Sequence, residues 1–247
     1  NDIKQIIGLQ VNTDYIKQYE KTGVWPLRYG QIMIMTDQDH DGSHIKGLMM
    51  NIFDSMWPEL TKMGFITSMV TPIVKAFKGK NEKVFYTLQD YEKWRDSTNA
   101  KSWRIKYYKG LGTSSTKEAK EYFKQLKVIK YLPTEVDSET VEDESKSSEE
   151  SKEDDDKTSI KSTTSEKKTS TTYKSICPDL DLAFNKKRAN DRKAWLLNYE
   201  KNKIPDFNKK VISTKDFVDE ELIHFSNEDN DRSIPSLIDG FKPSQRK

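Results

Sequence analysis

Apolar and polar residues follow one another along this chain in two periods, one helical and one extended. The helical period is clearest between residues 45 and 60, where apolar side chains recur at steps of three and one, and it predicts an amphipathic helix. The apolar stripe consists of Ile45, Leu48, Met49, Ile52, Phe53, Met56, Trp57 and Leu60. The short apolar run Gln31–Thr36 predicts a buried strand before it. We expect either Asp41 or Ser43 to cap the helix.

The rest of the chain is predicted to alternate between strands and helices. Residues 1–30 are predicted as a helix followed by a loop. Strands are predicted at Phe65–Phe77, Lys83–Leu88 and Trp103–Tyr108, and helices at Asp90–Asp96 and Ser115–Leu126. Alternating elements favour an α/β fold with a sheet that is parallel in its core and flanked by helices. Residues 176–247 are predicted to be mostly helical, with an extended segment near Val211–Ser213.

One stretch, residues 134–172, follows neither period. It consists almost entirely of Ser, Thr, Glu, Asp and Lys and contains no aromatic residue. Such a segment cannot bury enough apolar surface to offset the entropy lost on ordering, so it is predicted to be a disordered insert. Its acidic part, residues 137–157, holds eleven acidic residues and three lysines, so the net charge of +2 conceals a basic remainder. The simplest interpretation is a solvated insertion; a mimic of DNA that competes for a basic face is the alternative.

Candidate chemistry is concentrated in the segment IMTDQDHDGSH, residues 34–44. Its aspartates, Asp37, Asp39 and Asp41, stand at alternate positions, which point to one face of an extended chain. Carboxylates grouped in this way repel one another unless a cation neutralises them. Mg²⁺ typically takes one or two carboxylates together with water and phosphate oxygens. The pattern therefore indicates a magnesium site for phosphoryl chemistry, at the carboxyl end of a strand.

A calcium EF-hand loop is the main alternative, because it also begins with D-x-D-x-D-G. That loop requires a bidentate glutamate at its twelfth position, where this chain has Leu48. It also requires a preceding helix, whereas a strand is predicted here. A surface turn with incidental acids is the simplest alternative. Neither His40 nor His44 is expected to bind metal, because His40 alternates to the face opposite the aspartates and His44 begins the helix.

Composition narrows the class of protein further. No apolar run approaches the roughly eighteen residues of a membrane span, and no secretory leader is evident. Cys177 is the single cysteine, so no intrachain disulfide can form. The chain does not begin with Met, and we expect it to be part of a longer protein. A basic segment, residues 186–193, holds five cations, which by itself is typical of a solvated helix face.

Four stretches in the same order resemble the eukaryotic type II DNA topoisomerases. They are TDQDHDGSHIKGL, KYYKGLGT, LAFNKKRANDRKAWL and the segment from DFVDEEL through GFKPSQRK. The first resembles that family's TOPRIM metal-binding motif and the last the start of its winged-helix DNA-cleavage domain. The resemblance implies a Rossmann-like TOPRIM fold and three regions. These are a TOPRIM metal-binding domain at 1–133, the insert at 134–172, and a closing segment with the start of the cleavage domain at 173–247.

The resemblance also implies roles for single residues. Asp37 would touch two metal ions, Asp39 the second, and Asp41 would support the site. Contacts to the DNA backbone are implied for Arg192, Lys193 and Lys242, and a loop near the cleavage site for Lys109 and Gly110. Contacts of this kind position a duplex without specifying its sequence. The family's nucleophilic tyrosine and one metal-binding glutamate are expected outside these residues, so this part alone is not expected to cleave DNA.

The implied activity is that of an ATP-dependent isomerase. It cleaves both strands of one duplex transiently, passes another duplex through and reseals the break. Two Mg²⁺ ions, for which Mn²⁺ or Ca²⁺ can substitute in binding, would be the cofactors here, and ATP would bind elsewhere in the parent protein. Double-stranded DNA and a second copy of the parent protein are the expected partners, in the nucleus. Two alternatives stay open: a metal-dependent DNA-binding TOPRIM module without cleavage, and another TOPRIM enzyme such as a primase or nuclease.

Overall fold

The computed structural model describes residues 2–11, 13–98, 100–108, 111–134, 175–235, 238 and 240–242. They belong to one compact unit that contains both Asn1–Thr134 and Lys174–Lys247. The other unit, Glu135–Tyr173, lies outside the described residues, and so does the predicted insert apart from Thr134.

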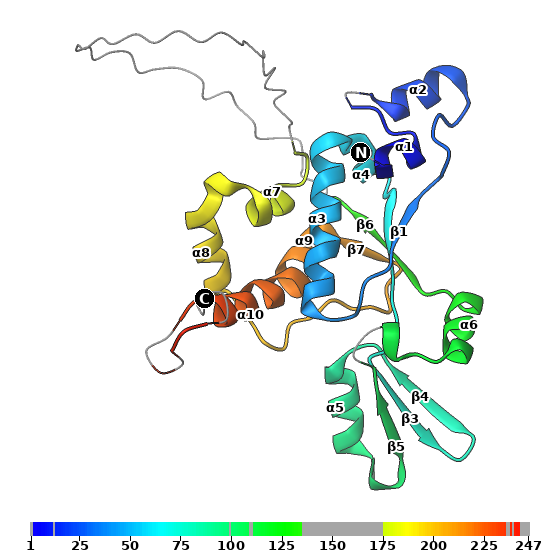
Figure 1. Ribbon diagram of the computed structural model, residues 1–247, viewed down its shortest axis with the longest axis vertical. Coiled ribbons are helices and arrows are strands. Elements are labelled where there is room, and N and C mark those ends of the chain that lie inside the picture. Colours follow the sequence, from blue (N-terminus) through cyan, green and yellow to red (C-terminus); the bar gives the residue numbers. More distant parts are fainter. Residues whose placement is uncertain are drawn as a thin grey trace, which may run out of the picture. The chain divides into compact units, whose positions relative to one another are not determined.

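A four-stranded mixed sheet forms the centre of the described unit (Figure 1). In spatial order its strands are β1 (Ile32–Ile34), β2 (Ile66–Met69), β6 (Val128–Leu132) and β7 (Val211–Ser213). The pairs β1–β2 and β6–β7 are parallel, whereas β2 and β6 are antiparallel. The α/β class is therefore confirmed, although β6 was not predicted. Because β6 and β7 come from opposite sides of the insert, the two flanks share one sheet.

A second, three-stranded sheet is antiparallel throughout. Its order is β4 (Asn81–Phe85), β3 (Val74–Lys78) and β5 (Arg104–Tyr107), and α5 (Leu88–Ser97) packs against it. The prediction of one strand over Phe65–Phe77 was wrong, because the segment divides into β2 and β3, which lie in different sheets. Pro72 stands in the break and has no N–H with which to continue a ladder. Val74, Ala76, Phe85 and Trp94 form the small core of this sheet.

The remaining described helices, other than α5, occur on both sides of the insert in the sequence. The helices before the insert are α1 (Asp2–Ile7), α2 (Tyr15–Thr22), α3 (His40–Met56), α4 (Pro58–Lys62) and α6 (Thr116–Lys124), with 3-10 turns at Ala100–Ser102 and Leu111–Thr113. After the insert come α7 (Pro178–Phe184), a 3-10 turn at Lys186–Arg188 and α8 (Ala189–Leu197). The last helix is continuous over residues 214–233: α9 (Thr214–Asp216), a π-helical segment (Phe217–Leu222) and α10 (Ile223–Ser233). None of the described helices is long and apolar enough to cross a membrane.

Helix α3 is central to the packing, because α7, the π-helical segment and α10 all contact it (Figure 1). Its buried residues are Gly42, Ser43, Lys46, Gly47, Met50, Phe53 and Asp54. A methyl group at Gly47 would lie 2.9 Å from the Cζ atom of Phe184, so glycine permits the close approach of α7.

The predicted apolar stripe of this helix is only half correct. Ile45, Leu48 and Ile52 are 51%, 40% and 44% exposed, whereas Phe53 and Trp57 are buried. Helical periodicity predicts an apolar face, but packing against the neighbouring helices determines which residues of that face are buried. The helix also ends at Met56 rather than at Leu60, because Pro58 cannot continue the hydrogen-bond pattern and starts α4.

Candidate metal site and basic helix

The acidic turn, residues 37–42, joins the end of β1 to the first turn of α3. Because β1 is parallel to β2, the turn lies at the carboxyl end of a parallel strand, where open α/β sheets bind ligands. Gln38 Nε2 donates a 3.1 Å hydrogen bond to the carbonyl oxygen of Met69, at the end of β2. The side chains of Asp37, Asp39 and Asp41 are all exposed.

Helix α3 begins at His40, so the extended alternation of the aspartates ends at Asp39. Asp39 is the N-cap: its Oδ1 accepts a 2.8 Å hydrogen bond from the backbone N–H of Gly42. The expected caps, Asp41 and Ser43, were therefore wrong, because the helix starts earlier than its apolar stripe. A carboxylate at this position also meets the positive end of the helix dipole.

Gly42 is required by the shape of the turn. A Cβ atom at this position would lie 2.0 Å from the carbonyl oxygen of Asp37 and 3.2 Å from Oδ1 of Asp39. The backbone of Asp37 is thus folded directly against the first turn of the helix. This close approach places the first two aspartates of the motif beside the helix N-terminus.

Asp41 is held by α10. Its two carboxylate oxygens accept hydrogen bonds of 2.9 and 3.2 Å from the guanidinium group of Arg232, and hydrogen bonding to Arg232 lowers the pKa of Asp41. Beside it, His40 Nδ1 contacts the carboxylate of Glu228. The ring of His44 stacks on that of Phe225, with 4.0 Å between centroids.

Arg232, Glu228 and Phe225 were not predicted as partners of this site. Their sequence signal is weak, because all three belong to a polar helix more than 180 positions away. Glu228 is 188 positions from His40, and Arg232 is 191 positions from Asp41.

The described residues contain no group of three Asp, Glu, His or Cys side chains placed to hold one metal ion. The three aspartates are thus not brought together as one ligand set. Asp41 is engaged by Arg232 and Oδ1 of Asp39 caps the helix, whereas Asp39 Oδ2 and the Asp37 carboxylate are predicted to hold the metal. One or two carboxylates plus water and phosphate suffice for Mg²⁺. The donor set fits that ion, and the assignment of Asp37, Asp39 and Asp41 stays a prediction.

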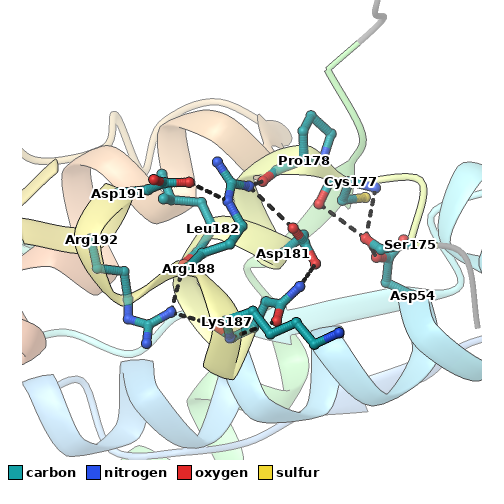
Figure 2. A network of polar contacts seen from close by, with 11 residues as sticks. Asp54, Ser175, Cys177, Pro178, Asp181, Leu182, Lys187, Arg188, Asp191 and Arg192 are labelled. Carbon is teal, nitrogen blue, oxygen red and sulfur yellow. Dashed lines mark hydrogen bonds and ion pairs between the residues drawn. The ribbon is translucent and has the colours of Figure 1, made fainter. Parts of the chain in front are cut away.

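The two arginines of the basic segment are bound within the protein (Figure 2). Arg188 donates to the carboxylates of Asp191, at 2.7 Å, and Asp181, at 3.2 Å. Arg192 Nη1 donates to the carbonyl oxygens of Leu182 and Asn185, at 3.2 and 2.5 Å, and so binds the C-terminal end of α7. A guanidinium group has five N–H donors, so a phosphate contact by Arg192 remains a prediction beside this structural role.

The other predicted DNA contacts are distributed along the chain. Lys193 is exposed on α8, and Lys242 is partly exposed. Lys109 and Gly110 lie outside the described residues, so their predicted loop is not placed. The described cations of the basic segment that project into solvent are Lys186, Lys187 and Lys193.

Asp54 fixes the chain where it returns from the insert (Figure 2). It is fully buried on α3; its carboxylate accepts hydrogen bonds from the hydroxyl group of Ser175 and from the N–H of Ile176, the latter at 3.3 Å. Cys177 is also buried, and burial together with the nearby Asp54 raises the pKa of its thiol. The cysteine is therefore packed as an inert side chain.

The fold and the acidic turn together define an α/β domain of the TOPRIM class. A family model described as "C-terminal associated domain of TOPRIM" matches residues 69–178 and 145–230. The chain belongs to this family, and its resemblance to the eukaryotic type II DNA topoisomerases is confirmed along its whole length.

Relatives with curated names include DNA topoisomerase 2-alpha of Mus musculus, 41% identical, and DNA topoisomerase 2 of Plasmodium falciparum, 43% identical. Each alignment covers 100% of this chain but 14% and 15% of the relative, so the chain spans about a seventh of their length. A solved structure, the Plasmodium falciparum topoisomerase II DNA-binding, cleavage and re-ligation domain, is 40% identical and matches with a TM-score of 0.73. That match covers 99% of this chain and 28% of the solved one.

Proposed function

We propose that this chain is the part of an ATP-dependent type II DNA topoisomerase that supplies its Mg²⁺-binding acidic turn and contacts to the DNA backbone. The observation that carries the proposal is the match of fold and sequence, over nearly the whole chain, to a solved domain described as the DNA-binding, cleavage and re-ligation domain of a topoisomerase II. The names of the curated relatives support it. They favour it over a non-catalytic module and over a primase or nuclease. The parent protein is proposed to act as a homodimer on double-stranded DNA in the nucleus.

The structure supports different roles for the three aspartates of the acidic turn. Asp37 and the outer oxygen of Asp39 would hold the metal, while Asp41 is oriented by Arg232. Bound Mg²⁺ would stabilise the attacking and leaving oxygens of an in-line displacement at phosphorus. The positive end of α3 adds attraction for a phosphate placed beside these residues. On α8, Lys193 would position the duplex by its charge alone, since a lysine behaves as a point charge toward phosphate.

The test is to separate DNA binding from cleavage in the full-length parent protein. Asp37→Asn removes a proposed metal ligand with little change of size, so it should abolish Mg²⁺-dependent plasmid relaxation and leave duplex affinity intact. Asp96→Asn is the matched control, because the Asp96 side chain is 70% exposed and pairs with its neighbour Arg95. Relaxation and fluorescence anisotropy of a labelled duplex are measured for each variant across a range of Mg²⁺ concentrations.

Two outcomes of this experiment would contradict the proposal. Relaxation by Asp37→Asn at the wild-type rate and wild-type Mg²⁺ requirement would remove the acidic turn from the reaction. Tight binding that is selective for Ca²⁺ and survives Asp37→Asn would instead indicate a calcium site and contradict the two-metal assignment.

A further inference from the structure

A buried ion pair lies directly behind the acidic turn. Lys46, on the second turn of α3, is 2% exposed, and Glu221, in the π-helical segment, is 8% exposed. The Lys46 Nζ atom lies 2.5 Å from Glu221 Oε1. The other carboxylate oxygen, Oε2, is also buried and has no hydrogen-bond partner among the described residues.

The pair favours the ammonium form of Lys46. Burial disfavours the ammonium form of Lys46, but the attraction of Glu221 outweighs this effect, so the pKa of Lys46 lies above its usual range. The rings of Tyr131 and Phe217 flank the ammonium group, each with its centroid 5.6 Å away. A buried ion pair of this kind is weak evidence for stability, because a well-packed apolar pair of similar volume is often as stable. Stability alone therefore does not explain why Lys46 and Glu221 form a buried ion pair here.

The explanation is a connection to the cap of α3. Glu221 Oε1 also accepts a 2.7 Å hydrogen bond from the hydroxyl group of Ser43, which lies 3.2 Å from the carbonyl oxygen of Asp39. The N–H of Ser43 donates to that same carbonyl oxygen at 3.1 Å. One carboxylate oxygen thus fixes the first two turns of the helix at once. The position of Asp39 depends on those turns.

The helix that carries Glu221 contacts the acidic turn repeatedly. Four of its residues lie four, three and four positions apart, which places them on one helix face. They are Glu221, Phe225, Glu228 and Arg232. Their respective partners at the start of α3 are Ser43 with Lys46, His44, His40 and Asp41. Glu221 is the one member of this set that lies in the π-helical segment, and such segments are frequent at functional sites.

We propose that Lys46 and Glu221 form a positioning pair, which holds the acidic turn in its metal-binding conformation and couples that turn to the helix over residues 214–233. Lys46 acts through Glu221, and Glu221 acts through Ser43, which in turn contacts the backbone carbonyl oxygen of Asp39. The inference rests on the proposed function insofar as it assigns metal binding to the acidic turn. The effect of the pair on the conformation of the acidic turn does not depend on bound metal, so that effect is measured without metal.

The test compares stability with order in the turn. Lys46→Met and Glu221→Met each leave one buried charge unpaired and should lower the melting temperature of this chain, whereas the double variant should recover it. Glu220→Gln is the matched control, since Glu220 is the preceding residue and its carboxylate is 3.7 Å from Lys203 instead. Two further measurements are made on the double variant: amide hydrogen exchange at Gly42 and Ser43 without metal, and Mn²⁺ affinity by calorimetry.

In the double variant, exchange at Gly42 and Ser43 should accelerate, and Mn²⁺ affinity should fall by about 10- to 100-fold, as for lost support of metal ligands. A double variant with wild-type stability, wild-type exchange and wild-type Mn²⁺ affinity would overturn the proposal and leave the pair as packing alone. Accelerated exchange in a chain whose wild type binds no Mn²⁺ would uphold the positioning pair and count against the proposed metal function. If the double variant does not recover its stability, Ser43→Ala, which removes one hydrogen bond, must produce the same local acceleration for the proposal to stand.

Discussion

The three aspartates of one short motif occupy three different environments. The backbone of Asp37 packs against Gly42. Asp39 caps α3, and Asp41 forms a bidentate contact with Arg232. Their substitutions should therefore not be equivalent. Loss of the Asp39 carboxylate removes a helix cap as well as a proposed metal ligand, so the effect of Asp39→Asn on metal binding cannot be separated from its effect on the helix. Asp37 is not the cap of α3, which makes Asp37→Asn the better test of metal binding.

Gly42→Ala should destabilise the chain by about 1–3 kcal/mol, the usual effect of forcing an extra carbon into a packed position. The added methyl group would meet the Asp37 carbonyl oxygen at 2.0 Å, so the turn must open and Mn²⁺ affinity should fall with stability. Thermal unfolding and calorimetry measure the two effects. Gly30→Ala is the control, because nothing lies within 4 Å of the added carbon. Equal melting temperatures for the two variants would contradict the described geometry of the turn.

Arg192 and Lys193, neighbours on α8, should respond differently to alanine. Arg192→Ala removes the guanidinium donor from the carbonyl groups of Leu182 and Asn185, of which Asn185 keeps the backbone N–H of Arg188, and should lower the free energy of unfolding by about 1–3 kcal/mol. Lys193→Ala should change it by less than about 0.5 kcal/mol. In the parent protein, Lys193→Ala should still lower the salt slope of log affinity for duplex DNA by about one, for every sequence alike. An altered cleavage-site preference without a change of slope would count against a backbone contact.

At the scale of elements, α6 is tied to the second sheet through one carboxylate. Ser115 and Glu118 form a capping box at the start of α6, and Glu118 also accepts hydrogen bonds from Lys106, at 2.8 and 2.9 Å, and from Tyr108. Burial raises the pKa of Glu118, but these hydrogen bonds outweigh it and lower the pKa to about 2. The carboxylate is thus bound mainly in its charged form.

This shift predicts a pH dependence of stability. Because the folded-state pKa of Glu118 lies below the unfolded value of 4.5, its contribution is complete above pH 4.5 and is lost as the pH falls toward about 2. After allowance for solvent screening, Glu118→Gln should cost about 1–2 kcal/mol at pH 7. Urea unfolding of both proteins between pH 7 and pH 2 measures the difference. A difference that stays constant over this range would exclude the charged form as its cause.

At the scale of the whole molecule, the regions on either side of the insert depend on each other. β6 pairs with β7 across the insert, α7 packs on α3, and Asp54 binds the backbone of Ile176. The predicted regions at 1–133 and 173–247 therefore contribute to one compact unit.

A single cut within residues 137–157, by a site-specific protease at an engineered sequence, should leave the two pieces associated. They should elute together in native size-exclusion chromatography and apart in denaturant, because the sheet and the α3–α7 contact do not need the connecting chain. Ile212→Asp should release the pieces after the same cut, since Ile212 is 3% exposed in β7. Separation of the wild-type pieces would show that the connection itself holds the unit together. Deleting the insert should change stability by no more than about 1 kcal/mol.

The local sequence pattern was sufficient to predict many of the elements of this protein. The strand before the acidic turn and the short extended segment at Val211–Ser213 were predicted where they occur, and the helix after the turn was predicted with bounds that lie too late in the sequence. The acidic motif was found because its charge pattern is local, and the helix predicted at Ser115–Leu126 is observed as α6. Strand β6 was not predicted, because a pattern of five residues is too short to be distinguished from a loop.

The sequence by itself thus determined the class of fold, the acidic turn and the family. The tertiary structure decided which side of α3 is buried, which aspartate caps it and which residues support it. Lys46 and Asp54 are charged residues on an apolar helix, and hydropathy assigns such residues to solvent. They are buried because their partners, Glu221 and Ser175, come from 175 and 121 positions away. Periodicity reports local conformation, whereas the burial of a charge depends on a partner that only folding brings near.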